Sequence, residues 1–318
     1  MQYAQLGKSG LTVSRICFGC WQLSPRFWGE VAIGPWRKAL DKAVELGVNF
    51  VDTAGAYGDG YAEEMLGGYF QDSGNREHFV LATKFYWTFK KARRHPDTSY
   101  AFIIQECEDA LRRLKTDYID LFQVHAWDPL TRPDEVAAAL GRLQQEGKVR
   151  LFGVSNLNVE QMALYLRYVD VASLQPLYNM IDREAESREL PFCLRERIGV
   201  ITYSSLHRGL LTGKYTRDTQ FDDDRRNLAL YQGRSFHCMI DALDALRPLA
   251  EKHNLTVAQF SIRWLLTHPA VTSAIVGIKT PEHIASIVPA ADGALPAEDW
   301  HEAARVIAEA KREALRLS

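Results

Sequence analysis

The chain has 318 residues, of which 47% are hydrophobic and 25% are charged, and its formal net charge is -2 at neutral pH. These values are typical of a globular protein, and the small net charge gives no electrostatic reason to expect binding to nucleic acid or an anionic membrane. No apolar run approaches the roughly 20 residues that span a bilayer, and the N-terminus lacks a signal-peptide pattern. The five cysteines are few and odd in number, so we expect a reducing, cytoplasmic location.

Strand-like and helix-like segments alternate along the chain. Short apolar runs predict strands, and apolar residues three and four positions apart predict amphipathic helices. In chain order we expect a hairpin over residues 1–13, strand 15–19, helix 36–44, strand 49–51, helix 63–70, strand 79–83, helix 103–114, strand 118–124, helix 133–147, strands 149–154, 170–175 and 199–203 with helices between them, helix 257–265, strand 273–276 and a last helix over 298–317.

Eight strand–helix alternations without a break in composition predict an α/β fold, a (β/α)₈ TIM barrel. We expect residues 1–318 to form one barrel domain, with the N-terminal β-hairpin across the barrel floor and an extra C-terminal helix. Continuous apolar runs fit strands that are buried on both faces. Residues 204–235 are predicted to be a long loop without secondary structure, and such loops in compact domains are usually functional.

Four chemically active side chains follow three of the predicted strands. Asp52 and Tyr57 come after strand 49–51, Lys84 after strand 79–83, and His125 after strand 118–124. In a barrel, the carboxyl ends of the strands meet at one face, where active sites lie. The four residues are therefore expected to form one polar cluster.

This cluster has the groups needed to protonate a carbonyl oxygen while hydride arrives at its carbon. A tyrosine stays protonated at neutral pH and can act as an acid, and a nearby ammonium would favour its phenolate. Lys84 could supply that ammonium, with Asp52 positioning it, and His125 could hydrogen-bond the carbonyl oxygen. No protein side chain supplies hydride, so a cofactor is implied.

Each residue also has a structural interpretation. Asp52 could cap a turn, Tyr57 could be a loop aromatic, Lys84 could extend along apolar surface, and His125 could be a core histidine. Their shared position at one barrel face favours function. Residues 58–63 begin like a dinucleotide-binding fingerprint but have glutamate in place of the third glycine. Cys17 and Cys20 form a CxxC pair without a second ligand pair, so no metal site is expected and buried thiols are favoured.

Residues 52–58, Asp-Thr-Ala-Gly-Ala-Tyr-Gly, followed by residues 63–67, Glu-Glu-Met-Leu-Gly, resemble the Asp–Tyr segment of the aldo-keto reductases. Lys84 and His125 stand where that family has its lysine and histidine, and the resemblance extends over nearly the whole chain. Residues 209–215 resemble the pyrophosphate-covering loop of the bacterial branch that includes inositol-utilisation and glycerol/glyceraldehyde reductases. The resemblance implies a barrel enzyme that transfers hydride reversibly between NADP(H) and a carbonyl.

The resemblance also implies the cofactor contacts. Ser155, Asn156 and Gln175 would hold the nicotinamide amide, and Tyr203 would stack on the ring. Gly19, Cys20 and Trp21 would lie near cofactor and substrate. The pyrophosphate would contact Ser204, Leu206, Arg208 and Lys214.

The adenosine end departs from the family pattern. Residues 277–283, which begin with Gly277, resemble the segment that holds the 2′-phosphate and adenine, and Lys279 offers a charge for that phosphate. Arg225 or Arg226 could add another. His283 stands where glutamine is common and Ile287 where asparagine is usual. NADP(H) is therefore expected, with NAD(H) as the alternative.

The expected substrate is a small carbonyl compound or alcohol. Trp21, residues 25–28, Tyr86, Trp87 and Trp127 would surround the pocket mouth, and Arg26 with the basic run 90–95 favours a polar or anionic aldehyde or sugar. Two alternatives stay open. The potassium-channel β subunits resemble these enzymes but carry asparagine in place of His125. A sugar isomerase or glycosidase is the other, although glycosidases need two facing carboxylates.

Overall fold

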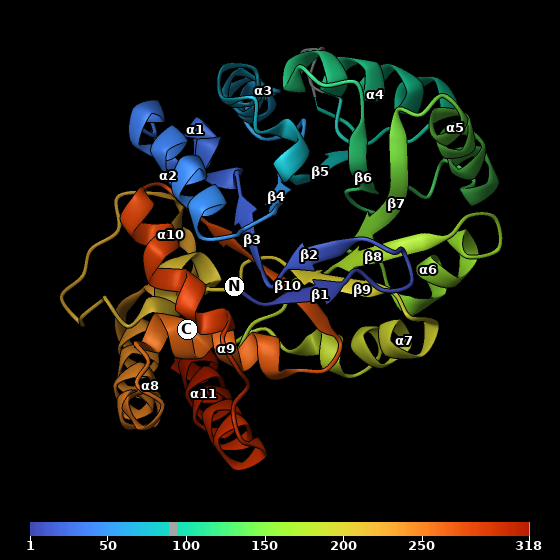
Figure 1. Ribbon diagram of the computed structural model, residues 1–318. Coiled ribbons are helices and arrows are strands. Elements are labelled where there is room, and N and C mark those ends of the chain that lie inside the picture. The colour runs from blue at the N-terminus through green and yellow to red at the C-terminus, as the bar shows by residue number, and fades with distance from the viewer. Residues whose placement is uncertain (89–93, 318) are drawn as a thin grey trace.

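Parallel strands close into a barrel at the centre of the molecule (Figure 1). The structure, a computed structural model, describes residues 1–88 and 94–317, without the side chains of Arg26 and Phe27. Within these ranges, eight strands follow the order β10-β3-β4-β5-β6-β7-β8-β9, and every neighbouring pair is parallel. Their bounds are β3 Ile16–Gly19, β4 Phe50–Asp52, β5 Val80–Phe85, β6 Ile119–Val124, β7 Val149–Ser155, β8 Val171–Gln175, β9 Gly199–Thr202 and β10 Val271–Gly277.

Helices surround the barrel, and their apolar faces pack on the outer face of the strands (Figure 1). In α2, for example, Trp36, Ala39, Leu40 and Ala43 recur at helical spacing and are all buried. The α-helices are α1 Pro25–Trp28, α2 Ile33–Glu45, α3 Tyr61–Ser73, α4 Tyr100–Leu114, α5 Pro133–Gln145, α6 Val159–Tyr165, α7 Glu189–Glu196, α8 Gly233–Lys252, α9 Val257–Thr267, α10 Pro281–Ile287 and α11 Ala297–Leu317. The predicted barrel and its extra C-terminal helix are thus confirmed.

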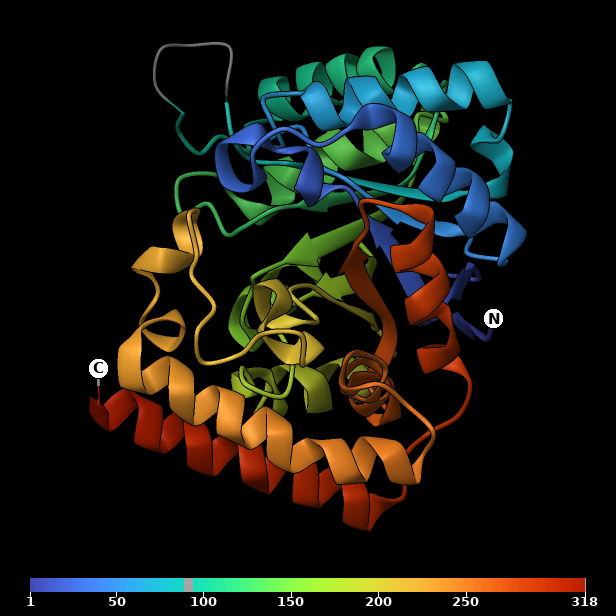
Figure 2. The same cartoon turned by 90° about the vertical axis from the view of Figure 1, so that its left-hand side faces the viewer.

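The N-terminal hairpin covers the floor of the barrel, as predicted. Strands β1 (Tyr3–Gln5) and β2 (Thr12–Ser14) pair antiparallel. Leu6 and Val13 are fully buried and belong to one cluster with barrel residues such as Phe50 and Leu121. Figure 2 shows the hairpin at one end of the barrel and the segment 203–232 (gold) at the other. With its floor closed, the barrel is left accessible at the carboxyl ends of its strands.

The prediction of a structureless loop over residues 204–235 is wrong. This segment contains three short 3₁₀ helices, η4 His207–Thr212, η5 Asp224–Asn227 and η6 Ala229–Tyr231, and α8 already begins at Gly233. The Phe221 ring packs edge-on against Tyr215, Tyr231 and Phe236 at centroid distances of 5.1, 5.2 and 5.5 Å. Through this aromatic cluster the segment packs against the main hydrophobic core, a contact that periodicity does not reveal.

None of the helices in the described ranges has the length and apolar character needed to cross a bilayer.

Candidate functional site

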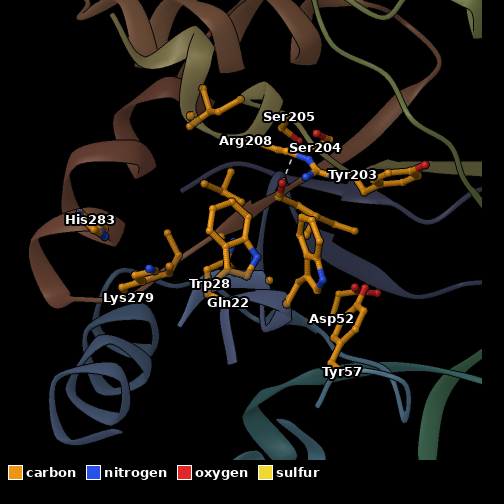
Figure 3. A pocket seen from close by; sticks show the side chains of 18 of the residues that line it. Gln22, Trp28, Asp52, Tyr57, Tyr203, Ser204, Ser205, Arg208, Lys279 and His283 are labelled. Atoms are coloured by element: carbon orange, nitrogen blue, oxygen red, sulfur yellow. Dashed lines mark hydrogen bonds between the residues drawn. The ribbon is translucent and has the colours of Figure 1, made fainter. Parts of the chain in front are cut away.

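A cavity of about 840 Å³ opens at the carboxyl ends of the barrel strands. Figure 3 shows Asp52 and Tyr57 at one end of it and Lys279 and His283 at the other, with Ser204, Ser205 and Arg208 along one side. Trp28 stands between the two ends. The cavity is therefore elongated, with an acid–phenol end and a basic end.

Lys84 binds Asp52 and Tyr57 at the first end of the cavity. Its Nζ donates to Asp52 Oδ1 at 2.6 Å, to the Thr53 carbonyl oxygen at 2.7 Å and to the Tyr57 hydroxyl at 3.2 Å. Lys84 and Asp52 are each only 2% exposed. Strands β4 and β5 are adjacent and in register, with Asp52 opposite Ala82, so their carboxyl ends bring the carboxylate and the amine together.

Burial and charge act in opposite directions on this group. Burial raises the pKa of the Tyr57 phenol to about 12, although the Lys84 ammonium acts to lower it. The expected effect of Lys84 on the phenol is therefore present but outweighed. For Lys84 itself, burial acts to lower the pKa, but Asp52 and Tyr57 together raise it above its ordinary value. At neutral pH the site therefore holds a protonated phenol beside a charged amine.

His125 lies beside Tyr57 at the end of β6. The two ring centroids are 6.1 Å apart with an interplanar angle of 77°. Burial, followed by the neighbouring Lys84 charge, lowers the pKa of His125 to about 3. The imidazole is therefore neutral at neutral pH and carries one N–H donor.

The residues expected at the nicotinamide amide form one hydrogen-bonded group. The Ser155 hydroxyl donates to the Gln175 backbone oxygen at 2.9 Å, and the Asn156 side-chain amide donates to Ser155 Oγ at 3.1 Å. Asn156 accepts from the Tyr203 hydroxyl at 2.9 Å. These contacts fix the side chains of Ser155, Asn156 and Tyr203, at the ends of β7 and β9, on one wall of the cavity.

Basic side chains gather at the opposite end. Lys279 and Arg225 lie 5.6 and 5.8 Å from the Trp28 ring, and Arg225 forms an ion pair with Asp223 at 2.6 Å. Burial, then the charges of Arg225 and Lys214, lowers the pKa of Lys279. This mutual repulsion among cations indicates a site suited to an anionic group.

Two buried polar atoms in the cavity wall have no hydrogen-bond partner among the described residues. They are the Gln22 side-chain oxygen and the Trp28 indole nitrogen. Such orphaned atoms are costly unless a ligand or water satisfies them. They fit a polar ligand that runs between the two ends, as a dinucleotide would.

Most of the predicted site residues line this cavity. They are Gly19, Trp21, Asp52, Tyr57, His125, Ser155, Asn156, Gln175, Tyr203, Ser204, Leu206, Arg208, Lys214, Arg225, Gly277, Lys279 and His283. Among the residues predicted for catalysis or cofactor binding, Lys84 and Cys20 do not line it. Lys84 contacts the cavity through Tyr57 and Asp52, and Cys20 is fully buried in the hydrophobic core. Arg226, the alternative to Arg225, and the expected pocket-mouth residues Tyr86 and Trp127 do not line the cavity either. Because Cys20 precedes the short helix η1 (Trp21–Leu23), its side chain turns into the core while Trp21 and Gln22 face the cavity.

Sequence reasoning missed several residues of the site, among them Gln22, Ser205 and Asp223, which line the cavity. It also missed Gln123, which contacts the site through Asp52. Of these, Gln123 carried a usable signal, because it shares a strand face with Leu121 and His125 inside an apolar run. Of the basic run at 90–95, residues 90–93 lie outside the described residues, as does the Arg26 side chain. Arg94 lines the cavity and hydrogen-bonds the Ala56 backbone oxygen and Asp59.

Cys17 lies in β3, and Cys20 lies directly before the three-residue 3₁₀ helix η1. Both thiols are fully buried, and burial raises the pKa of Cys17 and of Cys20. All five cysteines are free thiols. Among the described residues, no group of three or more His, Cys, Asp or Glu side chains is placed to hold a metal ion.

Comparisons with known proteins agree with this geometry. Aldo-keto reductase YhdN of Bacillus subtilis (strain 168) is 35% identical over 302 residues, which cover 94% of this chain and 91% of that protein. A probable voltage-gated potassium channel subunit beta of Arabidopsis thaliana is 31% identical, with 92% of each chain covered. The NADH-specific methylglyoxal reductase of Escherichia coli (strain K12) is 30% identical, covering 89% of this chain and 91% of that one.

Among solved structures, the glycerol dehydrogenase AKR11B4 from Gluconobacter oxydans superposes with a TM-score of 0.87 at 32% identity, covering 95% of this chain and 94% of that one. The model of the Aldo/keto reductase family matches residues 15–308, nearly the whole chain. With the barrel and the polar cluster at its open end, this match identifies the chain as a member of the aldo/keto reductase family.

Proposed function

We propose that this protein is an NADP(H)-dependent oxidoreductase that transfers hydride reversibly between the nicotinamide and an aldehyde, ketone, sugar or alcohol, with Tyr57 as the general acid and base. The observation that carries the proposal is the contact of Lys84 Nζ with both Asp52 and the Tyr57 hydroxyl at the end of an elongated cavity. We also propose that the single barrel domain, residues 1–318, provides all of these groups.

The side chains would act on the carbonyl oxygen. Tyr57, protonated at neutral pH, would donate its proton to that oxygen, and neutral His125 would donate a hydrogen bond to it. When bound, the cofactor supplies the hydride for the carbonyl carbon, or accepts it in the reverse reaction. In that reverse direction the Tyr57 phenolate would take the proton of an alcohol.

Lys84 and Asp52 would assist proton transfer from Tyr57. The ammonium lies 3.2 Å from the phenol oxygen and stabilises the negative charge that forms there when the proton leaves. Asp52 holds the ammonium at 2.6 Å and keeps it charged although it is buried. Proton donors and positioned charges of this kind typically raise rates by about 10²–10⁴-fold.

The basic end of the cavity supports NADP(H) over NAD(H). Lys279 lines it with Lys214, Arg225 and His283, which could meet a 2′-phosphate. The E. coli relative named as NADH-specific keeps NAD(H) as the alternative. Titration of each cofactor by energy transfer from tryptophan would decide between them. Lys279→Met is expected to weaken NADPH binding about tenfold and leave NADH binding unchanged; equal affinity of the native protein for both would contradict the assignment.

A substrate screen tests the proposed reaction. Aldehydes, ketones, sugars and polyols are assayed with both cofactors by absorbance of the reduced nicotinamide. Trp21, Trp28 and Trp87 line the cavity together with Arg94, which forms an ion pair with Asp59, so small polar or anionic carbonyl compounds are expected to react best. Absence of turnover with every compound, while the cofactor binds, would contradict the proposal.

The Arabidopsis relative supports a second candidate, a cofactor-binding regulatory subunit. His125 lines the cavity beside Tyr57 and could donate a hydrogen bond to a carbonyl oxygen, which favours the enzyme. Protein that bound NADPH, reduced no aldehyde and held a partner protein stably would favour the regulatory function.

A further inference from the structure

A fully buried glutamine lies inside the barrel, next to the polar cluster but outside the cavity wall. Gln123 is on β6, opposite Gly153 on β7, and Gly153 is opposite Ser173 on β8. A Cβ atom on Gly153 would lie 3.0 Å from Gln123 Cγ and 2.5 Å from Ser173 Oγ. Glycine at 153 therefore leaves the room that the Gln123 side chain needs to cross the barrel.

Gln123 reaches the carboxylate that also binds Lys84. Asp52 Oδ1 accepts from Lys84 at 2.6 Å. Asp52 Oδ2 accepts from the amide nitrogens of Gln175 at 2.9 Å and Gln123 at 3.4 Å. Gln175 Nε2 also lies 3.4 Å from Gln123 Oε1. One oxygen of the carboxylate thus serves the amine, and the other serves both glutamines.

This arrangement determines which way the Gln175 amide points. An ionised carboxylate accepts hydrogen bonds and donates none, so Gln175 must turn its NH₂ group toward Asp52. Its carbonyl oxygen is then left for a ligand in the cavity that Gln175 lines. That oxygen is an acceptor, suited to the N–H of a carboxamide.

We propose that Gln123 is a positioning residue, which holds Asp52 and Gln175 in this orientation so that Gln175 accepts a hydrogen bond from the cofactor carboxamide. The inference rests on the proposed function. It also links cofactor binding to proton donation, because the carboxylate that orients Gln175 is the one that holds the Lys84 ammonium against Tyr57.

A cycle of two proteins and two cofactors tests this role. Native protein and Gln123→Met, which keeps the length of the side chain without its amide, are titrated with NADP⁺ and with its 3-acetylpyridine analogue. The analogue has a methyl ketone in place of the carboxamide and so has no N–H to donate. Native protein is expected to prefer NADP⁺ by about two- to tenfold, the range of one hydrogen bond. The preference of Gln123→Met should be smaller than the native one, because Asp52 and Gln175 lose a contact that holds them in place.

Ser173→Ala is the matched control, because it changes the same interior layer at a hydroxyl that has no hydrogen-bond partner among the described residues. This variant should keep the native preference for NADP⁺ over the analogue. General repacking of the interior would instead weaken the binding of both ligands equally. Gln123→Leu repeats the test if the methionine variant does not fold. An unchanged preference in the variants at Gln123 would overturn the positioning role alone. Failure of native protein to bind either ligand would overturn the proposed function with it.

Discussion

At Tyr57, burial and the Lys84 charge shift the pKa of the phenol in opposite directions, and their balance decides whether the phenol is protonated near neutral pH. Burial raises the pKa of the phenol to about 12 while Lys84 acts to lower it, and His125 has a pKa of about 3. Around neutral pH neither group titrates, so Tyr57 is a donor and His125 stays neutral. The site is thereby prepared for reduction without any change of protonation before the substrate binds.

The pH dependence follows from these two values. Carbonyl reduction, which needs the protonated phenol, is expected to be nearly constant between about pH 5 and pH 9. Alcohol oxidation needs the phenolate, whose fraction rises about tenfold per pH unit below the pKa. Initial rates at saturating substrate in both directions check this. A reduction rate that falls steeply around neutral pH would contradict the raised pKa of Tyr57.

Removing the phenol oxygen separates chemistry from binding. Tyr57→Phe is expected to lower kcat for reduction by about 10²–10⁴-fold, because the proton donor is lost, with the cofactor Kd nearly unchanged. Tyr100→Phe makes the same chemical change at the start of α4, away from the cavity, and should leave kcat unaffected. An active Tyr57→Phe enzyme would refute the acid role.

Lys84→Met should lower turnover and change its pH dependence. Without the ammonium, nothing offsets the effect of burial, so the pKa of Tyr57 rises further and the phenolate becomes scarcer. Because both directions share one transition state, kcat/KM measured at one pH is expected to fall by the same factor for reduction and oxidation. The variant should also be less stable by about 3–5 kcal/mol, because Asp52 is left as an unpaired buried charge. A pH–rate curve identical to that of the native protein would argue against tuning by Lys84.

At the scale of elements, helix–helix contacts hold the loop that carries Tyr57. That loop leads into α3, which packs on α4 through Gly67. A Cβ atom at Gly67 would lie 2.7 Å from the carbonyl carbon of Leu114 at the end of α4. The next residue, Gly68, has open space around the same position. The two neighbouring glycines therefore have different reasons to be small.

Alanine substitutions at these glycines are expected to have opposite effects. Gly67→Ala should lower the free energy of unfolding by about 1–3 kcal/mol through overpacking. Gly68→Ala should raise it by up to about 1 kcal/mol, because alanine favours the helix more than glycine does. Urea unfolding of both variants provides the comparison. A stabilised Gly67→Ala protein would mean that α3 and α4 do not approach so closely.

For the whole molecule, the hairpin closes one end of the barrel and the cavity opens at the other end. Leu6→Ala in the hairpin removes a fully buried side chain from the floor cluster and should cost about 2–5 kcal/mol of stability. Cofactor affinity should stay the same, because the cavity lies at the opposite end. Thr12→Ala, at an exposed position of the same hairpin, should change stability by less than about 0.5 kcal/mol. A large loss of cofactor affinity in folded Leu6→Ala would show coupling between the two ends.

The sequence by itself determined the order of the elements and the kind of chemistry. Strand runs and helical spacing are local patterns, so all eight strands and the barrel were predictable, and Asp52, Tyr57, Lys84 and His125 stood out at strand ends. Short elements such as η4 and α10 were not, because tertiary contacts stabilise them. Their first and last residues depend on the same contacts.

Only the tertiary structure decided the distances and the electrostatic balance. Closure of the barrel pairs β10 with β3, which brings Gly277 beside Gly19 although they are far apart in the chain. It also turns Cys20 into the core and brings Gln123, Gln175 and Asp52 into contact. Desolvation of Tyr57 depends on every element packed around it. Contacts of this range are absent from any local pattern, so the sequence indicated the groups, and the fold determined how they act on each other.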